Sequence, residues 1–215
     1  MRDKHLLNNL EFPNDYEIWQ KSSANITDNK LEICGHPVME SWEKTYMQKL
    51  AEIVSTEGGN ILEIGYGMGL SSYYINQYSF DSHIIIEANT DVFNELKKFT
   101  LRNKKKIIPI FGFWEDITPF FANESFNGIL FDTYPIKKEN LFCERFRFLK
   151  EAYRLLKKNG IFTQYSGEVS FTEEYKKLII EAGFSNFTGV ICEVNPPESC
   201  LYWDDKKILA PIIRK

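Results

Sequence analysis

From residue 60 onward, the hydrophobic positions of the chain follow two alternating patterns. Short apolar runs predict buried strands, and apolar residues three or four positions apart predict amphipathic helices. The strands are expected at 60–65, 83–87, 106–111, 128–132 and 161–165. The helices that follow them are expected at 69–78, 90–102, 117–121, 140–157 and 172–182. This alternation is typical of an α/β protein that has a parallel sheet with helices on both faces.

The C-terminal end departs from the alternation. Apolar runs near 185–194 and 200–213 have no helix between them, only a loop that contains Pro196-Pro197. Two consecutive strands without a crossover helix predict an antiparallel hairpin. The expected fold is therefore a Rossmann-like, mostly parallel sheet of seven strands, closed by an antiparallel C-terminal hairpin.

The N-terminal end is less regular. Met39, Trp42 and Tyr46 recur at helical spacing, so a helix is expected over 38–56, with a proline in its first turn. Residues 1–30 are polar with scattered aromatic side chains and are expected to stay outside the core. We interpret 1–215 as one domain in which the arm formed by 1–34 can act as a lid.

Composition and charge narrow the class of protein. A chain of 215 residues is long enough for one full hydrophobic core. Its net charge of −4 gives no basic signature for nucleic acid. The four cysteines lack C-x-x-C spacing, which favours free thiols over zinc ligands. No apolar run has membrane-spanning length and no signal peptide is evident, so a cytoplasmic protein is expected.

Three glycines at alternate positions follow the first strand of the alternating region. Gly65, Gly67 and Gly69 stand where a strand turns into a helix, just after the acid Glu63. Glycine permits positive φ and close approach of a ligand, and a helix start offers unpaired N–H groups. The spacing is G-x-G-x-G, which differs from the dinucleotide fingerprint. Taken alone, the pattern is equally consistent with a structural turn.

A second acid supports a nucleotide-like ligand. Glu87 ends the next strand, where doubly wound sheets place a carboxylate that binds a ribose diol. The alternative is a solvated strand end. Other polar or aromatic residues are expected at the same edge of the sheet. They are Asn89, Trp114, Glu115 and Asp132. Trp114 suits either a purine ring or the core, and three scattered histidines argue against a metal site.

Several ordered segments together resemble one family of class I S-adenosylmethionine-dependent methyltransferases. The segments 35–43, 62–68, 85–89, 112–116, 128–135 and 196–200 are similar to guanidinoacetate N-methyltransferase. Related methyltransferases that modify arginine share part of the pattern. The resemblance extends from about Gly35 to the C-terminus, and linked motifs in order are more specific than any one of them.

The resemblance implies a cofactor site for S-adenosylmethionine. Its amino-acid end would be lined by Tyr66, Gly67, Met68, Gly69, Leu70 and Ser71. The ribose would be held by Glu87, with Ala88 and Asn89 alongside, and the adenine would lie at Trp114 and Glu115. The remaining members of the expected cofactor set are Trp19, Met47, Glu63 and Asp132.

The resemblance also implies an acceptor site for a guanidino group. Met39, Glu43 and Asp132 would contact it. A guanidinium is planar and pairs well with carboxylates, and one of its nitrogens must lose a proton as the methyl arrives. Asp132 is the expected base and Glu43 the orienting carboxylate.

The chain departs from the family at Gly167-Glu168, where the family binds the carboxylate of guanidinoacetate with a backbone segment that ends in a hydroxyl residue. Glu168 would repel that carboxylate, so the sequence predicts that guanidinoacetate is not the substrate or that Glu168 points away. Arginine or agmatine would suit Glu168 better.

The expected function is thus N-methylation of a small guanidino compound by a monomer or homodimer. One alternative is methylation of protein or peptide arginine, and another is a non-catalytic S-adenosylmethionine-binding protein. The glycine spacing argues against a nicotinamide-dependent oxidoreductase.

Overall fold

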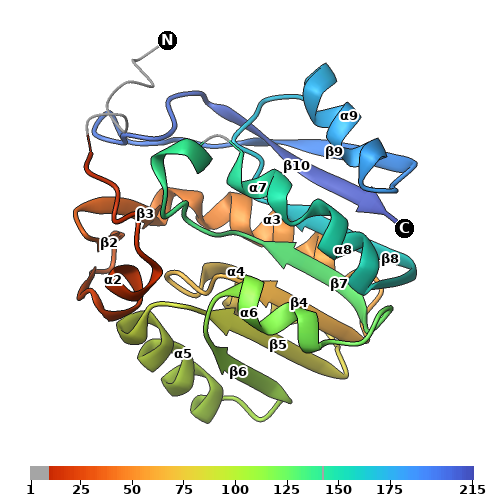
Figure 1. The fold of residues 1–215 in the computed structure, drawn as a ribbon, viewed down its shortest axis with the longest axis horizontal. Coiled ribbons are helices and arrows are strands. Elements are labelled where there is room, and N and C mark those ends of the chain that lie inside the picture. The colour runs from red at the N-terminus through yellow and green to blue at the C-terminus, as the bar shows by residue number, and fades with distance from the viewer. Residues whose placement is uncertain (1–9, 142) are drawn as a thin grey trace.

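The computed structural model of the chain describes residues 10–141 and 143–215. Its central sheet has seven strands in the order β6-β5-β4-β7-β8-β10-β9 (Figure 1). The strands are β4 (Asn60–Ile64), β5 (Ser82–Glu87), β6 (Ile107–Phe111), β7 (Phe126–Phe131), β8 (Leu156–Gln164), β9 (Asn186–Glu193) and β10 (Lys207–Arg214). The strands from β6 to β8 are parallel, whereas β10 is antiparallel to both of its neighbours. The predicted fold class is therefore confirmed.

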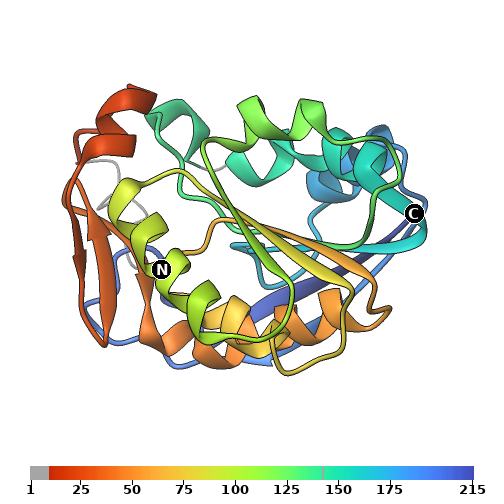
Figure 2. The ribbon, with the colours of Figure 1, turned by 90° about the horizontal axis from the view of Figure 1, so that it is seen from below.

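Two layers of helices cover the sheet (Figure 2). One layer contains α3 (Lys44–Ser55), α4 (Leu70–Ile75) and α5 (Thr90–Arg102). The other contains α6 (Trp114–Ile117), α7 (Glu144–Arg147), α8 (Leu149–Leu155) and α9 (Glu173–Glu181). Because side chains of a strand alternate between its faces, Ile61 packs in the core under α3 while its neighbour Leu62 packs in the core under α8. Both faces of the sheet are therefore buried, as a parallel sheet requires.

The N-terminal region forms a small antiparallel sheet instead of the expected helix start. The sheet consists of β1 (Ala24–Ile26), β2 (Lys30–Ile33) and β3 (His36–Glu40). A 3₁₀ helix, η1 (Ser41–Glu43), then leads into α3, so the prediction of a helix over 38–56 was wrong in its first three residues, which lie in β3. The reason is the two-residue turn at Cys34 and Gly35, whose φ values of 52° and 74° are those of a hairpin that pairs β2 with β3.

The N-terminal arm also contributes to the core, contrary to expectation. Trp19 lies on α2 (Tyr16–Lys21) and is only 5% exposed, and Leu31 and Ile33 of β2 are buried with it. Residues 1–9 of the arm lie outside the described residues.

Two other boundaries differ from the prediction. The region 140–157 holds η3 (Lys138–Asn140), α7 and α8 in place of one helix, and its position 142 lies outside the described residues. Strand β8 begins at Leu156, five residues early, because Leu156 pairs with Phe126 of β7. The short helix expected at 117–121 is α6 followed by η2 (Thr118–Phe120). No helix among the described residues is long and apolar enough to cross a membrane.

One buried side chain ties the arm to the sheet. Asn89, fully buried, accepts hydrogen bonds from the N–H groups of Asp91 and Val92 and so caps α5. Its amide donates to the carbonyls of Trp19 and Ser22 at 2.9 and 2.8 Å. The same residue therefore starts a helix of the main fold and holds the arm against it.

We expect Asn89→Ala to lower the free energy of unfolding by roughly 2–4 kcal/mol, because it removes a helix cap and leaves two carbonyls without their donors. Urea denaturation measures the change. Asn89→Asp is the matched control, since it keeps the capping oxygen and loses only the donors. Limited proteolysis should cut the arm faster in both variants, and equal rates for wild type and variants would contradict the tethering role.

Candidate active site

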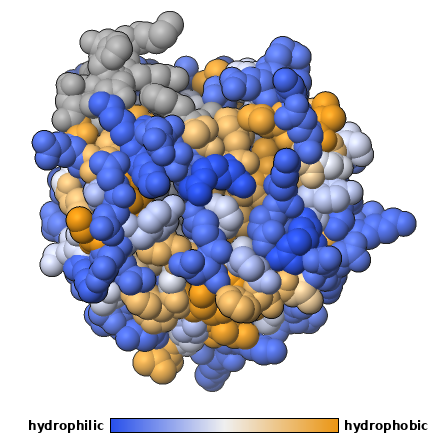
Figure 3. Space-filling view, viewed as in Figure 1, coloured by the Kyte–Doolittle hydropathy of each residue, from blue (hydrophilic) through white to orange (hydrophobic). Residues whose placement is uncertain are grey.

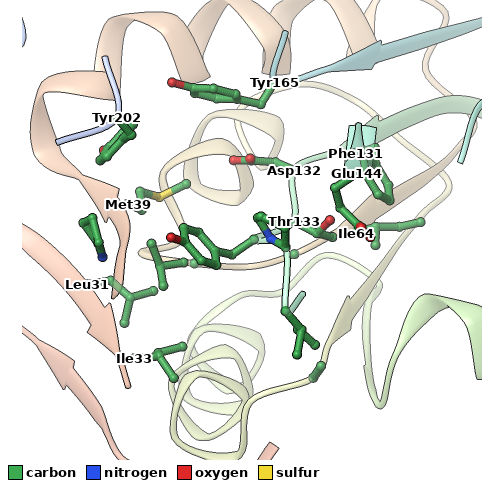
Figure 4. A pocket seen from close by; sticks show the side chains of 18 of the residues that line it. Leu31, Ile33, Met39, Ile64, Phe131, Asp132, Thr133, Glu144, Tyr165 and Tyr202 are labelled. Carbon is green, nitrogen blue, oxygen red and sulfur yellow. The ribbon is translucent and has the colours of Figure 1, made fainter. Parts of the chain in front are cut away.

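A cavity of about 430 Å³ lies beyond the carboxyl ends of β4, β5 and β7 (Figure 4). This volume suits a small-molecule ligand, and the position is where open α/β sheets bind theirs. The small N-terminal sheet forms one wall and the loop 198–204 forms another. The cavity gathers ten of the residues that the sequence predicted for the site. They are Trp19, Met39, Glu43, Gly67, Glu87, Ala88, Trp114, Glu115, Asp132 and Gly167.

The glycine turn forms the floor of the cavity. Gly65 has φ of +89°, and a Cβ on it would lie 1.9 Å from the carbonyl oxygen of Asp132. Gly67 has φ of +54°, and its Cβ would lie 3.0 Å from the sulfur of Met39. Only glycine fits at position 65, because a Cβ there would overlap the backbone of Asp132. The turn thus brings the tip of β7, with Asp132, directly against the end of β4.

The rest of the expected glycine-turn set lies behind that floor and does not line the cavity. It comprises Tyr66, Met68, Gly69, Leu70 and Ser71. Glu63 is fully buried, accepts hydrogen bonds from Ser71 and Ser72, and lies 2.8 Å from Nε2 of His83. Met47 is also completely buried in the core. Glu63 and Met47 therefore support the site from beneath, as does Asn89.

Glu87 faces the cavity in a fixed position. One carboxylate oxygen accepts a hydrogen bond from the N–H of Tyr66 at 3.0 Å, and the other accepts from the N–H of Asn89 at 2.7 Å. Burial raises its pKa, while these backbone hydrogen bonds lower it. A carboxylate held this way at the end of the second strand fits a ribose diol.

The cavity wall near α6 fits an adenine ring. The ring of Trp114 packs edge-on against Phe131 and Phe148, and the guanidinium of Arg147 lies 5.6 Å from the Trp114 ring centre. Arg147 pairs with Oε1 of Glu115 at 3.1 Å. Oε2 of Glu115 is buried and has no hydrogen-bond partner among the described residues. An exocyclic amino group of a purine would satisfy that oxygen.

Aromatic rings of the N-terminal arm cover the cavity. Trp19 stacks on Tyr134 with a centroid separation of 5.6 Å and an interplanar angle of 4°. Phe12 stacks on the same tyrosine, and Nδ1 of His36 lies 3.0 Å from its hydroxyl oxygen. The arm is thereby held against the cavity by contacts with Tyr134 in the loop that follows β7, and Trp19 and Tyr134 both line the cavity.

Glu43 is buried at the opposite end from Trp114. Its exposure is 2%, and its Oε1 accepts hydrogen bonds from the N–H of Glu40 at 2.9 Å and the hydroxyl of Tyr202 at 2.6 Å. Burial and then the negative charge of Asp132 raise the pKa of Glu43 to about 8. Both Glu43 and Asp132 line the same cavity.

Asp132 projects into the cavity from the tip of β7, beneath the ring of Tyr165 (Figure 4). Burial and the charge of Glu63 raise its pKa to about 7. Two carboxylates from distant parts of the chain thus meet in one cavity. A planar cation that pairs with both would remove their repulsion and lower both pKa values.

Sequence reasoning missed several residues that line the same cavity. Arg147, Tyr165 and Tyr202 belong to segments to which no motif pointed. Tyr134 was part of a quoted motif but was given no role. Tyr202 is 159 positions from Glu43 in sequence, so only the fold reveals their hydrogen bond. Glu168, which the sequence predicted for the acceptor site, does not line the cavity, and its N–H donates to Oγ of Ser166 at 3.2 Å.

The described residues contain no group of three or more histidine, cysteine or acidic side chains arranged to hold a metal ion. All four cysteines are free thiols, as expected.

A parallel sheet with an antiparallel terminal hairpin, a glycine turn after β4 and a buried acid at the end of β5 define a class I methyltransferase fold. The particular family follows from the sequence model of guanidinoacetate N-methyltransferase, which matches residues 13–215. The chain belongs to that family, which confirms the resemblance found in the sequence. The enzyme class of the family is the predicted one, an S-adenosylmethionine-dependent N-methyltransferase.

Among curated relatives, the protein arginine N-methyltransferase 2 of Aspergillus fumigatus is 28% identical over 193 residues, covering 84% of this chain and 42% of the relative. The protein of the same name from Debaryomyces hansenii is 30% identical over 217 residues, covering 87% of this chain and 48% of that relative. The chain spans less than half the length of either relative.

Solved structures show the same fold at low identity. Spermidine synthase from Thermotoga maritima matches with a TM-score of 0.62 and 15% identity, covering 89% of this chain and 72% of that one. TYW2 of M. jannaschii, in complex with AdoMet, matches with a TM-score of 0.59 and 12% identity, covering 90% of this chain and 84% of that one.

The raised pKa of Glu43 predicts a pH-dependent stability. Folded Glu43 keeps its proton up to about pH 8, whereas the unfolded carboxyl loses it near its ordinary value of 4.5. Between these values the folded state binds more protons, so the contribution of Glu43 to stability falls as pH rises.

We therefore expect Glu43→Gln to gain stability relative to wild type between pH 5 and pH 8, by at most about 1.4 kcal/mol per pH unit. The amide keeps an oxygen for Glu40 and Tyr202. Urea denaturation of the ligand-free protein at three pH values measures this, with Glu174→Gln on the exposed face of α9 as control. A difference between Glu43→Gln and wild type that is constant with pH would show that Glu43 titrates normally.

Proposed function

We propose that this protein transfers a methyl group from S-adenosylmethionine to a guanidino nitrogen of a small molecule. The observation that carries the proposal is the meeting of Glu43 and Asp132 in one cavity, both with raised pKa values. Such a pair is poorly stable by itself and is completed by a planar cation with several N–H donors. A guanidinium is that cation.

The residues at the other end of the cavity fit the cofactor. Glu87 would accept hydrogen bonds from the ribose hydroxyls, and Trp114 with Oε2 of Glu115 would receive the adenine. When bound, S-adenosylmethionine supplies an electrophilic methyl group on a sulfonium. The positive charge of that sulfonium would be favoured by the acidic residues that line the same cavity, Asp132 among them.

Asp132 and Glu43 would have different roles. Glu43 is fixed by two hydrogen bonds to its Oε1, so it would orient the guanidinium rather than move. Asp132, whose carboxylate no described group donates to, would accept the N–H proton as the new N–CH₃ bond forms and the S–CH₃ bond breaks. A pKa of about 7 suits a base that must bind and release a proton near neutral pH.

A second candidate is an arginine side chain in a protein or peptide. It is favoured by the curated relatives, which carry the name protein arginine N-methyltransferase 2. Trp19 of the N-terminal arm stacks on Tyr134 and both line the cavity, and such a wall favours a small acceptor because a peptide requires an open approach. Both candidate acceptors would use the same pair of carboxylates. They differ in whether the guanidino group belongs to a small molecule or to a longer peptide chain.

Incubation with methyl-labelled S-adenosylmethionine and four acceptors separates these candidates. The acceptors are guanidinoacetate, arginine, agmatine and a peptide that contains one arginine. Mass spectrometry should find the label on a guanidino nitrogen of a small compound. Exclusive labelling of the peptide would establish the second candidate, and binding of the cofactor without any transfer would contradict both.

Replacement of the base provides a direct check. Asp132→Asn should lower kcat at least about 100-fold, the usual contribution of a general base, while the affinity for S-adenosylmethionine stays within a few-fold of wild type. The control is Asp116→Asn, the same chemical change on the exposed face of α6 outside the cavity. Retention of most activity in Asp132→Asn would exclude Asp132 as the base.

A further inference from the structure

The hydroxyl of Tyr165 is buried and has no hydrogen-bond partner among the described residues, although its ring lines the cavity. The ring packs edge-on against Tyr46 at 5.5 Å, and the backbone N–H donates to the carbonyl of Phe131 at 3.1 Å. The side chain is therefore held firmly. An unpaired buried hydroxyl is costly unless a ligand pairs with it.

The surroundings of this hydroxyl are acidic. Burial raises the pKa of the Tyr165 phenol, and the next largest causes include the charges of Glu43 and Asp132. Figure 4 shows Tyr165 above Asp132, at the same end of the cavity as Tyr202. Tyr165 is thus a neutral oxygen beside two carboxylates.

No unpaired basic side chain balances these acids among the described residues that line the cavity. Among the described residues that line the cavity, Arg147 is the only basic side chain, and Glu144 and Glu115 already pair with it at the adenine end. The backbone N–H of Glu168 is likewise engaged by Ser166. The described residues of the cavity therefore offer no unpaired basic side chain to an anionic substrate tail, and the unpaired donors that line it, Trp203 Nε1 and Thr133 Oγ1, are neutral.

The oxygens that line the cavity can accept most of the N–H donors of a guanidinium. A monosubstituted guanidinium presents five N–H donors in about one plane. Oε1 of Glu43 already accepts from Glu40 and Tyr202, so Oε2 of Glu43 and the two carboxylate oxygens of Asp132 remain, and the Tyr165 hydroxyl adds a fourth oxygen. A neutral hydroxyl accepts one of these N–H groups without adding a third negative charge.

We infer that the acceptor is a guanidino compound whose tail carries no carboxylate close to the guanidino group, and that the Tyr165 hydroxyl binds this group directly together with Glu43 and Asp132. The inference rests on the proposed methyl transfer to a guanidino nitrogen. It narrows that proposal to neutral or cationic tails.

Matched pairs of acceptors test the charge of the tail. Guanidinoacetate and guanidinoacetamide have nearly the same shape and differ in one negative charge, as do 4-guanidinobutyrate and its amide. We expect kcat/KM for the amide of each pair to exceed that for the acid at least about tenfold, since like charges repel strongly in a buried site. An acid that is used as well as its amide overturns the inference and leaves the methyl transfer intact. Failure of all four compounds, with arginine and agmatine also inert, overturns the proposed function and the inference with it.

Replacement of the hydroxyl tests Tyr165. In Tyr165→Phe we expect KM for the best amide to rise about tenfold, with unchanged affinity for S-adenosylmethionine and an unchanged or higher melting temperature, because the hydroxyl has no partner in the protein to lose. Tyr153→Phe on α8 removes a hydroxyl outside the cavity and is the control. An unchanged KM in Tyr165→Phe would show that this hydroxyl does not bind the acceptor.

Discussion

The site depends on one electrostatic constraint, which is that the buried carboxyl group of Glu43 and the partly buried one of Asp132 line the same cavity. Among the described residues that line it, the only basic side chain is Arg147, which already pairs with Glu115 and Glu144. Each alone is costly to ionise away from water, and each makes ionisation of the other more difficult. Burial raises the pKa of Glu43 to about 8 and that of Asp132 to about 7. Near neutral pH the ligand-free protein therefore keeps a proton on Glu43 and part of one on Asp132, and a guanidinium would displace these protons on binding.

The fold maintains this arrangement by fixing both acids from distant parts of the chain. Glu43 ends η1, and Tyr202 from the loop before β10 holds its carboxylate. Asp132 follows β7, and its carbonyl oxygen lies so near Gly65 that no side chain fits there. Because α3, β4 and β7 pack in one core, neither acid is free to move away from the other. The repulsion is thus supported by packing of the whole domain core.

The central sheet could be predicted because its signals are local. Each strand from β4 to β8 is an apolar run followed by a helical pattern, and Glu63, Glu87 and Asp132 mark strand ends within a few residues. The small N-terminal sheet could not be predicted, because its strands are short and mix polar with apolar residues. In addition, Met39 of β3 continues the helical spacing of α3. Its decisive feature is a turn at Cys34 and Gly35 that depends on backbone angles.

In the candidate site, too, residues with a local sequence signal could be predicted and residues without one could not. Residues next to a motif, such as Glu87 and Trp114, could be predicted, and the cavity contains them. Glu63 is also an acid near the end of a strand, as Glu87 is, and the sequence does not distinguish the two. In the structure Glu63 accepts hydrogen bonds from Ser71 and Ser72 and does not line the cavity. Tyr165 and Tyr202 had no local signal at all, since their neighbours in the site are contributed by other elements. Their roles follow from burial and hydrogen bonding, which pattern alone does not specify.

Calorimetry of acceptor binding tests the central claim most directly. Binding of a guanidinium to two protonated or half-protonated carboxylates must release protons, so the apparent enthalpy at pH 6.5 should depend on the ionisation enthalpy of the buffer. The account predicts net release of between one and two protons per acceptor bound to the complex with S-adenosylhomocysteine, and roughly one fewer when Asp132 or Glu43 is replaced by its amide. A binding enthalpy that is the same in every buffer would mean that both acids are already ionised, which would contradict the account.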